Sequence, residues 1–458
     1  MENNDLKYLG TLLILVVLIF LIGFIFCSKS DFRLLEWEEK GYHAETGIKH
    51  GIPAFNSTLI DYKRNGKTVL TVKLDEPVII DVAKKPEKWG YFQFPGIYKT
   101  IDGILVATWH MAEDAVTSYG LVGGSRSVVS YDDGKTWCEI NNSIPSVGGI
   151  ELPNGDRIKV HTPKPINRKD LILPDSLTTV KENYGRNFVY YKMNELPQEL
   201  QGVYLSRMKE GENLWKTEKA ILNDKSAVRY IDSGWFPVVW WGDMQITPDG
   251  SILAGIYPGF YIDEDKKVPP SGVIFYRSTD SGKSWNYQGK IPYQPDLTTD
   301  HNGMKRTVLG FTEPASVLLS NGIYLCVMRT TDGLGNSPMY VSHSTDQGVS
   351  WTKPKTFTNS GVLPKLLQLE NGSIVLASGR PGIQLRFAID EKGEAWTDPF
   401  EMLPFENLQG EVSCGYPDIV PAGPNSFHLI YSDFKYQNEN GEIRKAIKIR
   451  KVEVIKSK

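Results

Sequence analysis

The sequence predicts an all-β chain, a six-bladed β-propeller preceded by an N-terminal transmembrane helix. The pattern Ser-x-Asp-x-Gly-x-x-Trp occurs three times, as "SYDDGKTW" at 130–137, "STDSGKSW" at 278–285 and "STDQGVSW" at 344–351. A strand that follows an Asp-Gly or Asn-Gly turn, a strong hairpin signal, precedes each of these boxes. From about residue 58 to 452, short apolar runs alternate with Gly, Asn, Asp and Pro, and no long stretch has a helical period.

The hairpins and boxes together indicate the number of blades. The hairpin pattern recurs as "TIDGILVATWH", "TPDGSILAGIY", "LSNGIYLCVMR" and "LENGSIVLASGR". Two degenerate boxes, "SRMKEGENLW" and "AIDEKGEAW", bring the box tryptophans to positions 137, 215, 285, 351 and 396. Such spacing, with about four short strands in each unit, is typical of propeller blades. A closing blade from 415–452 and an N-terminal strand near 67–82 would make the sixth.

The boxes are expected to be structural. Within each box, Asp and Gly favour a tight turn, Ser or Thr is placed to cap it, and Trp is placed to pack between neighbouring sheets. They therefore predict the architecture and not the chemistry.

The N-terminal segment is long and apolar. Residues 8–26 carry no charge over 19 positions, which is enough to span a bilayer as a helix. Because the stretch ends in bulky Phe24-Ile25-Phe26, an uncleaved anchor is favoured over a signal peptide, and a lipoprotein modified at Cys27 is the alternative. We expect a single-pass anchor with an extracytoplasmic propeller, although the excess of basic residues after the span slightly favours the opposite orientation. The expected organisation is a tail at 1–7, an anchor at 8–27, a tether at 28–57 and the propeller at 58–458.

Composition excludes several classes of function. The formal net charge is −3 and no basic cluster carries interleaved aromatic residues, so no nucleic-acid partner is predicted. The four cysteines and seven histidines show no disulfide framework and no metal-ligand spacing. The sequence therefore predicts no metal and no cofactor.

The propeller geometry predicts which residues meet. Inner strands converge on the central axis, so residues that begin them, or that end the strand after each hairpin turn, should gather at one rim. The strand starts are Gln93, Asp243, Glu313, Lys365 and Tyr416, and the strand ends are His110, Tyr257, Arg329 and Arg380 with Asp114 close behind. Because clustered buried charges are costly unless they are paired or functional, this mixture of acid, base, phenol and guanidinium indicates a site.

Over roughly residues 85–450 the boxes and hairpins resemble the sialidase (neuraminidase, BNR-repeat) superfamily. The segment "FTEPASVLLSNGIYLCVMR" resembles the sialidase segment in which a Glu opens an inner strand and a substrate-binding Arg closes the next, here Glu313 and Arg329. "CGYPDIVPAGPNSFHLIYSD" resembles the segment with the catalytic tyrosine, here Tyr416. Arg380, in "ASGRPG", matches a second member of the arginine cluster more loosely.

One departure from the family pattern concerns specificity. Sialidases begin the first blade with an Arg-Ile-Pro-type motif whose Arg binds the substrate carboxylate, whereas this chain has "FQFP" with Gln93 at that position. Loss of one charge-assisted contact weakens carboxylate recognition, while Gln still hydrogen-bonds a neutral hydroxyl or amide.

The resemblance implies a glycosidase mechanism. Sialidases use a Tyr nucleophile, here Tyr416, and Glu313 would take its proton. Asp114 would protonate the leaving oxygen and then activate water, with Glu113 as a competing candidate. Arg329 and Arg380 would hold an anionic group of a terminal sugar, and further sugar contacts are expected from Gln93, His110 and Asp243.

Three functions follow as hypotheses. The first is a membrane-anchored, exo-acting glycoside hydrolase that acts on a glycan partner. The second is a glycan-binding propeller that has lost the chemistry, for which Gln93 is the motivating residue. The third is a polysaccharide lyase or rhamnosidase-type propeller with His110 or Tyr257 as the base.

Overall fold

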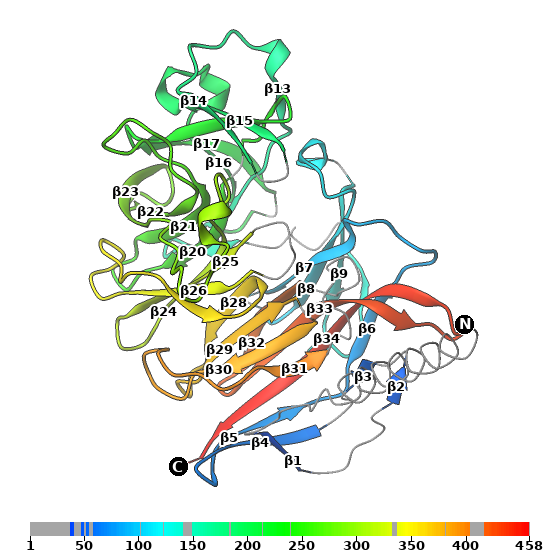
Figure 1. The fold of residues 1–458 in the computed structure, drawn as a ribbon. Coiled ribbons are helices and arrows are strands. Elements are labelled where there is room, and N and C mark those ends of the chain that lie inside the picture. Colours follow the sequence, from blue (N-terminus) through cyan, green and yellow to red (C-terminus); the bar gives the residue numbers. More distant parts are fainter. Residues whose placement is uncertain are drawn as a thin grey trace, which may run out of the picture.

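The protein is seen in a computed structural model, which is all-β apart from short 3-10 helices in the described residues (Figure 1). Outside three short strands between 37 and 54, the structure describes residues 58–100, 102–121, 123–140, 149–182, 185–212, 214–238, 240–331, 337–380, 382–403 and 416–457. The 3-10 helices are η1 (Val116–Ser118), η2 (Arg168–Asp170), η3 (Met193–Glu195), η4 (Gln198–Leu200) and η5 (Gly303–Lys305).

Three sheets are four-stranded antiparallel meanders, as expected of propeller blades. The first contains β7 (Tyr91–Lys99), β8 (Leu105–Met111), β9 (Ser125–Ser130) and β10 (Cys138–Glu139). The second contains β24 (Phe311–Leu318), β25 (Tyr324–Thr330), β26 (Met339–Ser344) and β27 (Lys355–Thr358). The third contains β28 (Val362–Gln368), β29 (Ile374–Gly379), β30 (Ile383–Phe387) and β31 (Phe400–Leu403).

The terminal sheet joins the two ends of the propeller region. Its strands are β1 (Trp37–Lys40), β4 (Thr58–Arg64), β5 (Lys67–Leu74), β34 (Ile443–Lys456), β33 (Ser426–Gln437) and β32 (Pro417–Gly423), with β6 (Val78–Val82) also on β34. β5 pairs antiparallel with β34, so the N-terminal strand expected near 67–82 lies in one sheet with the C-terminal strands. A separate hairpin pairs β2 (Gly47–Lys49) with β3 (Ile52–Ala54).

The region predicted as two blades forms one eight-stranded sheet. It combines β11 (Ile150–Glu151), β12 (Arg157–Val160), β16 (Val203–Met208) and β17 (Lys216–Asn223) with β23 (Ser284–Ile291), β22 (Gly272–Ser278), β21 (Ile252–Gly259) and β20 (Trp241–Ile246). The two halves meet where β17 and β23 pair in parallel. The count of six separate blades therefore stays a prediction.

A five-stranded insertion sheet interrupts this region, and the sequence did not predict it. Its strands are β13 (Ile166–Asn167), β19 (Trp235–Phe236), β18 (Val228–Asp232), β15 (Asn187–Lys192) and β14 (Thr178–Lys181). It has its own small core, in which Phe188, Tyr190 and Tyr230 pack against Phe260 from the loop after β21. Figure 1 shows it at the outer end of the molecule, far from the terminal sheet.

The first strands of the meanders face one another around a common centre. β20 contacts β24, β24 contacts β28, β28 contacts β32, and β32 contacts β7. Hydrophobic clusters fill the spaces between neighbouring sheets: Leu385 and Phe400 pack with Leu429 of the terminal sheet, and Phe275 packs with Phe311. This face-to-face packing agrees with a propeller-like arrangement.

A partly buried ion pair joins three inner strands. Lys365 Nζ of β28 lies 3.4 Å from Asp418 Oδ1 of β32, and Asp418 Oδ2 accepts a hydrogen bond from the backbone N–H of Ile97 in β7 at 3.0 Å. Burial opposes the charge on Lys365, but the carboxylates of Asp418 and Asp243 outweigh it and raise the pKa of Lys365. The charge of the lysine is thus kept in the centre of the fold.

The boxes form the predicted turns. In the first box the Asp132 carboxylate accepts hydrogen bonds from Ser130 Oγ at 2.9 Å and from both N–H and Oγ of Thr136 at 2.8 and 2.7 Å. Gly134 has φ 86°, a conformation that favours glycine, and its carbonyl accepts the indole N–H of Trp137 at 3.0 Å. Trp351 of the third box stacks on Phe275 of the neighbouring sheet, as the packing role predicted.

No helix in the described part of the chain is long and apolar enough to cross a membrane. The predicted anchor at 8–27 lies outside the described residues, and so does most of the tether at 28–57.

The ion pair at the centre predicts a large loss of stability on substitution. Asp418→Asn removes one of the two carboxylates that act on the Lys365 ammonium and leaves Asp243, so the free energy of unfolding should fall by about 2 kcal/mol in urea denaturation. Glu212→Gln is the control, because the Lys216–Glu212 pair is exposed and is expected to contribute less than about 1 kcal/mol. Equal effects of the two substitutions would contradict the central role of Asp418.

The first box predicts a pH-dependent contribution to stability. Hydrogen bonds from Thr136 lower the pKa of Asp132 to about 2, below the value of about 3.9 for an unfolded Asp. The contribution is therefore present above about pH 4 and is lost as the pH falls through about 2. Asp132→Asn should destabilise the protein at neutral pH, and unfolding curves should show this difference shrinking between those values. A difference that stays constant with pH would refute the interpretation.

Candidate active site

Strained backbone marks the rim where the inner strands begin. Five bulky residues that are not in hairpin turns or boxes have positive φ: Phe92 (56°), Phe94 (49°), Glu313 (45°), Leu363 (42°) and Arg380 (45°). The first four lie at register shifts of β7, β24 and β28, where an extra residue turns side chains out of the ladder. Strain of this kind persists where the surrounding structure fixes it, and it clusters at functional sites.

Glu313 and Arg329 form a mostly buried ion pair. The β24 bulge brings Glu313 Oε1 to 2.6 Å from Arg329 Nη1 at the end of β25, and the side chains are 12% and 15% exposed. Glu313 Oε2 accepts the backbone N–H of Leu363 at 2.8 Å, so the bulges of β24 and β28 are joined. Burial opposes the charge on Arg329, but Glu313 and Tyr416 outweigh it and raise its pKa.

Tyr416 lies beside this pair, immediately before β32. Its side chain is buried, and its hydroxyl oxygen accepts a hydrogen bond from Arg380 Nη2. Burial raises the pKa of Tyr416 to about 12, although the cations of Arg380 and Arg329 act in the opposite direction. The phenol is therefore protonated at neutral pH and needs a base to become a nucleophile.

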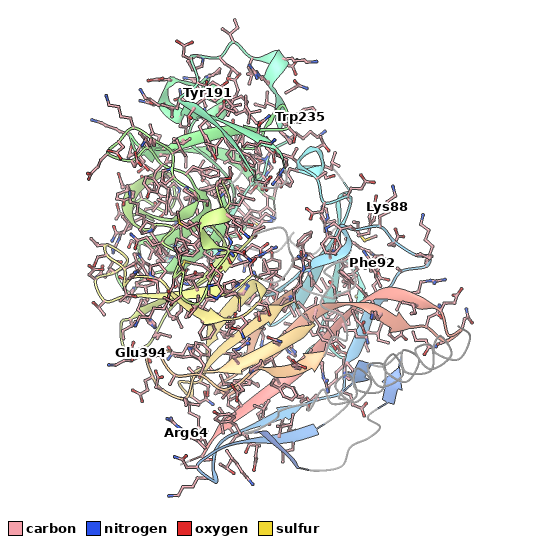
Figure 2. The ribbon with its side chains drawn as sticks, viewed as in Figure 1. Arg64, Lys88, Phe92, Tyr191, Trp235 and Glu394 are labelled. Atoms are coloured by element: carbon pink, nitrogen blue, oxygen red, sulfur yellow. The ribbon has the colours of Figure 1, made fainter. Side chains whose placement is uncertain are left out.

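The structure separates the two candidates for the acid/base residue. Asp114 Oδ2 accepts the indole N–H of Trp89 at 3.0 Å, and its charge contributes to the raised pKa of Tyr416. Glu113 instead forms an exposed ion pair with Lys88 at 3.0 Å. Lys88 and Phe92, labelled in Figure 2, mark the segment that enters β7 beside this loop. The geometry thus favours Asp114 over Glu113.

Gln93 and His110 both contact the backbone of Gly90. Gln93 is fully buried, and its Oε1 accepts the N–H of Gly90, while His110 Nδ1 lies 2.9 Å from the Gly90 carbonyl oxygen. Within the described part of the chain the Gln93 Nε2 atom has no hydrogen-bond partner. The substrate contacts predicted for these two residues remain untested, and the contacts described here hold a turn.

Asp243 belongs to a second cluster. Its carboxyl lies near Lys365 and Asp418 at the centre of the fold, and burial together with Asp418 raises its pKa against the effect of Lys365. The structure therefore associates Asp243 with the central ion pair. The predicted role in substrate binding stays a prediction.

Other aromatic residues near the site were missed or left as alternatives by the sequence reasoning. Tyr257 is half-buried, and desolvation together with the charge of Glu313 raises its pKa, while Arg329 acts in the opposite direction. Trp89 belongs to no motif identified in the sequence. Its position close to the "FQFP" segment was the only sequence signal that could have assigned it to the site. Burial, Asp114 and Asp232 of the insertion sheet raise the pKa of Tyr119, so this residue links the loop after β8 to the insertion.

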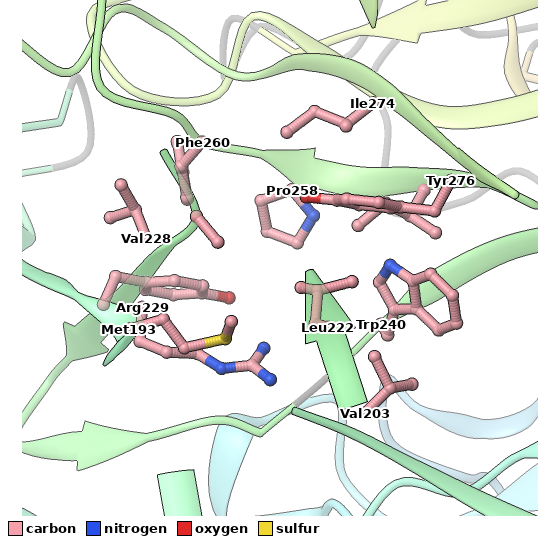
Figure 3. A pocket seen from close by; sticks show the side chains of 13 residues that line it. Met193, Val203, Leu222, Val228, Arg229, Trp240, Pro258, Phe260, Ile274 and Tyr276 are labelled. Carbon is pink, nitrogen blue, oxygen red and sulfur yellow. The ribbon is translucent and has the colours of Figure 1, made fainter. Parts of the chain in front are cut away.

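The enclosed cavity shown in Figure 3 lies elsewhere. It has a volume of about 30 Å³ and lies between the insertion sheet and β21–β22, with mostly apolar walls around the guanidinium of Arg229. That volume suits one or two water molecules and not a sugar ring. In the described part of the chain, no group of three or more His, Cys, Asp or Glu residues is arranged to hold a metal ion.

The chain resembles several solved structures in fold. A protein from Dyadobacter fermentans has 18% identity and a TM-score of 0.51, covering 84% of this chain and 99% of that one. A K499G variant of NanB sialidase from Streptococcus pneumoniae has 14% identity and a TM-score of 0.45, over 82% of this chain and 70% of that one. An α-L-arabinanase from Penicillium chrysogenum has 17% identity and a TM-score of 0.43, over 82% and 98%. No curated protein matches the chain significantly.

A family model assigns the repeats. Residues 242–429 match the BNR repeat-like domain, a range that contains the second and third boxes, Glu313, Arg329 and Tyr416. This match agrees with the resemblance predicted from the boxes and with the antiparallel meanders observed in the structure. Residues 242–429 of this chain therefore form a BNR repeat-like domain.

Proposed function

We propose that this protein is an exo-acting glycoside hydrolase that removes a terminal acidic sugar from a glycan. The observation that carries the proposal is the meeting of Tyr416, Arg380, Arg329 and Glu313 from three different sheets, with Asp114 acting on the same phenol. Glycosidases with a Tyr nucleophile need this combination of a phenol, a carboxylate base and a second carboxyl group.

Each group has a step in the reaction. Glu313, ionised beside Arg329, would take the proton from the Tyr416 hydroxyl as the phenolic oxygen attacks the anomeric carbon. Asp114 would donate its proton to the leaving oxygen, and in the second half it would take a proton from the water that releases the sugar. The aryl glycosyl-enzyme formed in between is broken by that water.

The charge of Arg380 supports an acidic sugar. Arg329 is neutralised by Glu313, whereas Arg380 contacts a neutral phenol and forms no ion pair with any described residue. Its guanidinium therefore keeps a charge for a carboxylate or another anionic group of the substrate. In this proposal the apolar stretch at 8–27 holds the domain at an extracytoplasmic membrane surface.

A glycan-binding protein without catalysis is the second candidate, and the observation in its favour is Gln93. With a buried amide at the position of the third arginine, an anionic sugar has one cation fewer to contact. Binding on a glycan array without release of sugar, at high protein concentration and long times, would favour this candidate.

Substitution of the proposed nucleophile and base tests the hydrolase directly. Tyr416→Phe and Glu313→Gln should each lower the turnover of an aryl glycoside at least about a hundredfold, because each removes a group that acts in the transition state. Tyr287→Phe removes an exposed phenol on β23 and serves as the control. Unchanged turnover in both site variants would exclude the assignment, and an unsaturated sugar among the products would instead identify a lyase.

The leaving group tests the role of Asp114. Asp114→Asn should lower turnover strongly for a glycoside with a poor, alkyl leaving group and only weakly for one with an activated dinitrophenyl group, which leaves without a proton. Glu113→Gln should behave as the unsubstituted protein with both substrates. A loss that is equal for both leaving groups would mean that Asp114 is not the acid.

A further inference from the structure

Trp89 touches both halves of the candidate site. Its indole N–H donates to Asp114 Oδ2 at 3.0 Å, and the guanidinium of Arg380 lies over its ring, 5.1 Å from the ring centroid. The same guanidinium lies 5.3 Å from the ring centroid of Tyr416, whose ring meets Trp89 edge-on at 6.4 Å. One half-buried side chain thus connects the proposed acid, the proposed anion-binding cation and the proposed nucleophile.

The backbone next to Trp89 is held from several directions. Gly90 donates its N–H to Gln93 and its carbonyl oxygen lies 2.9 Å from His110 Nδ1. At its φ of 97°, an added Cβ would lie 2.3 Å from the carbonyl oxygen of Ala112, so only glycine fits. This close approach sets the segment of Trp89 directly against the loop that carries Asp114.

The terminal sheet fixes the other side of the segment. Lys445 Nζ of β34 donates to the carbonyl oxygen of Lys88 at 2.6 Å and to that of Tyr91 at 3.1 Å. Phe434 of β33 meets the Trp89 ring edge-on at 6.1 Å. The position of the indole is therefore determined by two sheets, which is what a residue that orients others requires.

These contacts have two chemical consequences. The indole N–H holds one carboxylate oxygen of Asp114, Oδ2, and does not occupy the other. The ring face supports the guanidinium of Arg380 through a cation–π contact, which is stronger for Trp than for the other aromatic residues.

We propose that Trp89 is a positioning residue of the active site, which orients Asp114 through its N–H and Arg380 through its ring. This inference rests on the proposed function. It also gives Gln93 and His110 a role that the sequence did not predict, because both act through Gly90 on the position of Trp89.

Trp89→Phe tests the hydrogen bond while it keeps an aromatic ring. Hydrogen bonds to charged groups correspond to roughly a tenfold to hundredfold effect, so kcat for an alkyl glycoside should fall by about tenfold. For an activated dinitrophenyl glycoside, kcat should stay within about twofold, since proton donation is not needed there.

The control is Trp137→Phe, which removes a box indole that donates to the Gly134 carbonyl, away from the site. It should leave kcat unchanged for both substrates. Trp89→Phe with the kcat of the unsubstituted enzyme for the alkyl glycoside would overturn the proposal, and so would a loss that is the same for both leaving groups.

A second measurement is independent of turnover. In the full chain labelled with 5-fluorotryptophan, the ¹⁹F resonance of Trp89 is identified by its absence in Trp89→Phe. Asp114→Asn should shift this resonance, because it changes the group that accepts the indole N–H, whereas Glu113→Gln should leave the resonance in place. A resonance that is the same in Asp114→Asn and the unsubstituted chain would overturn the Trp89–Asp114 link. An unsubstituted enzyme that is inactive on every glycoside, with a resonance that still shifts in Asp114→Asn, would refute the proposed function and leave the link intact.

Discussion

The contact between Lys365 and Asp418 is the constraint on which the candidate site depends. The Asp418 carboxylate makes two contacts: one oxygen faces the Lys365 ammonium, and the other accepts the backbone N–H of Ile97. These two contacts join the three inner strands β28, β32 and β7. Tyr416 lies two residues before Asp418, so its hydroxyl has a fixed position relative to the neighbouring sheets. Because the pair is only partly buried, water screens part of the interaction, but removal of one partner still leaves the other charge with fewer contacts.

The residues with positive φ explain how regular antiparallel sheets can place the side chains of the candidate site. Plain antiparallel strands would point successive side chains to alternate faces of each sheet. The bulges with positive φ at Glu313 and Leu363 break that alternation, and a hydrogen bond from Leu363 to Glu313 joins them. The packed clusters between sheets hold this strain in place. The residues of the candidate site therefore lie at irregular positions in the strands, and the regular parts of the sheets hold them in place.

Much of this arrangement could be predicted from the sequence, and the failures have physical causes. Glu313 and Arg329 were expected together because one begins an inner strand and the other ends its hairpin partner, and the structure joins them at 2.6 Å. Gln93 was expected at the rim for the same reason. Two register shifts in β7 turn its side chain inward onto Gly90, a change that strand periodicity does not indicate.

The sequence alone determined the repeated turns, because each box encloses its own hydrogen bonds within eight residues, as Ser130, Asp132 and Thr136 illustrate. Such local contacts need no partner from elsewhere in the chain. Only the tertiary structure decided that Asp114 accepts the indole N–H of Trp89 while Glu113 pairs with Lys88, and that the same indole lies under Arg380. These contacts join separate strands and loops, and for Trp89 and Arg380 they join different sheets, so the packing of the elements sets them.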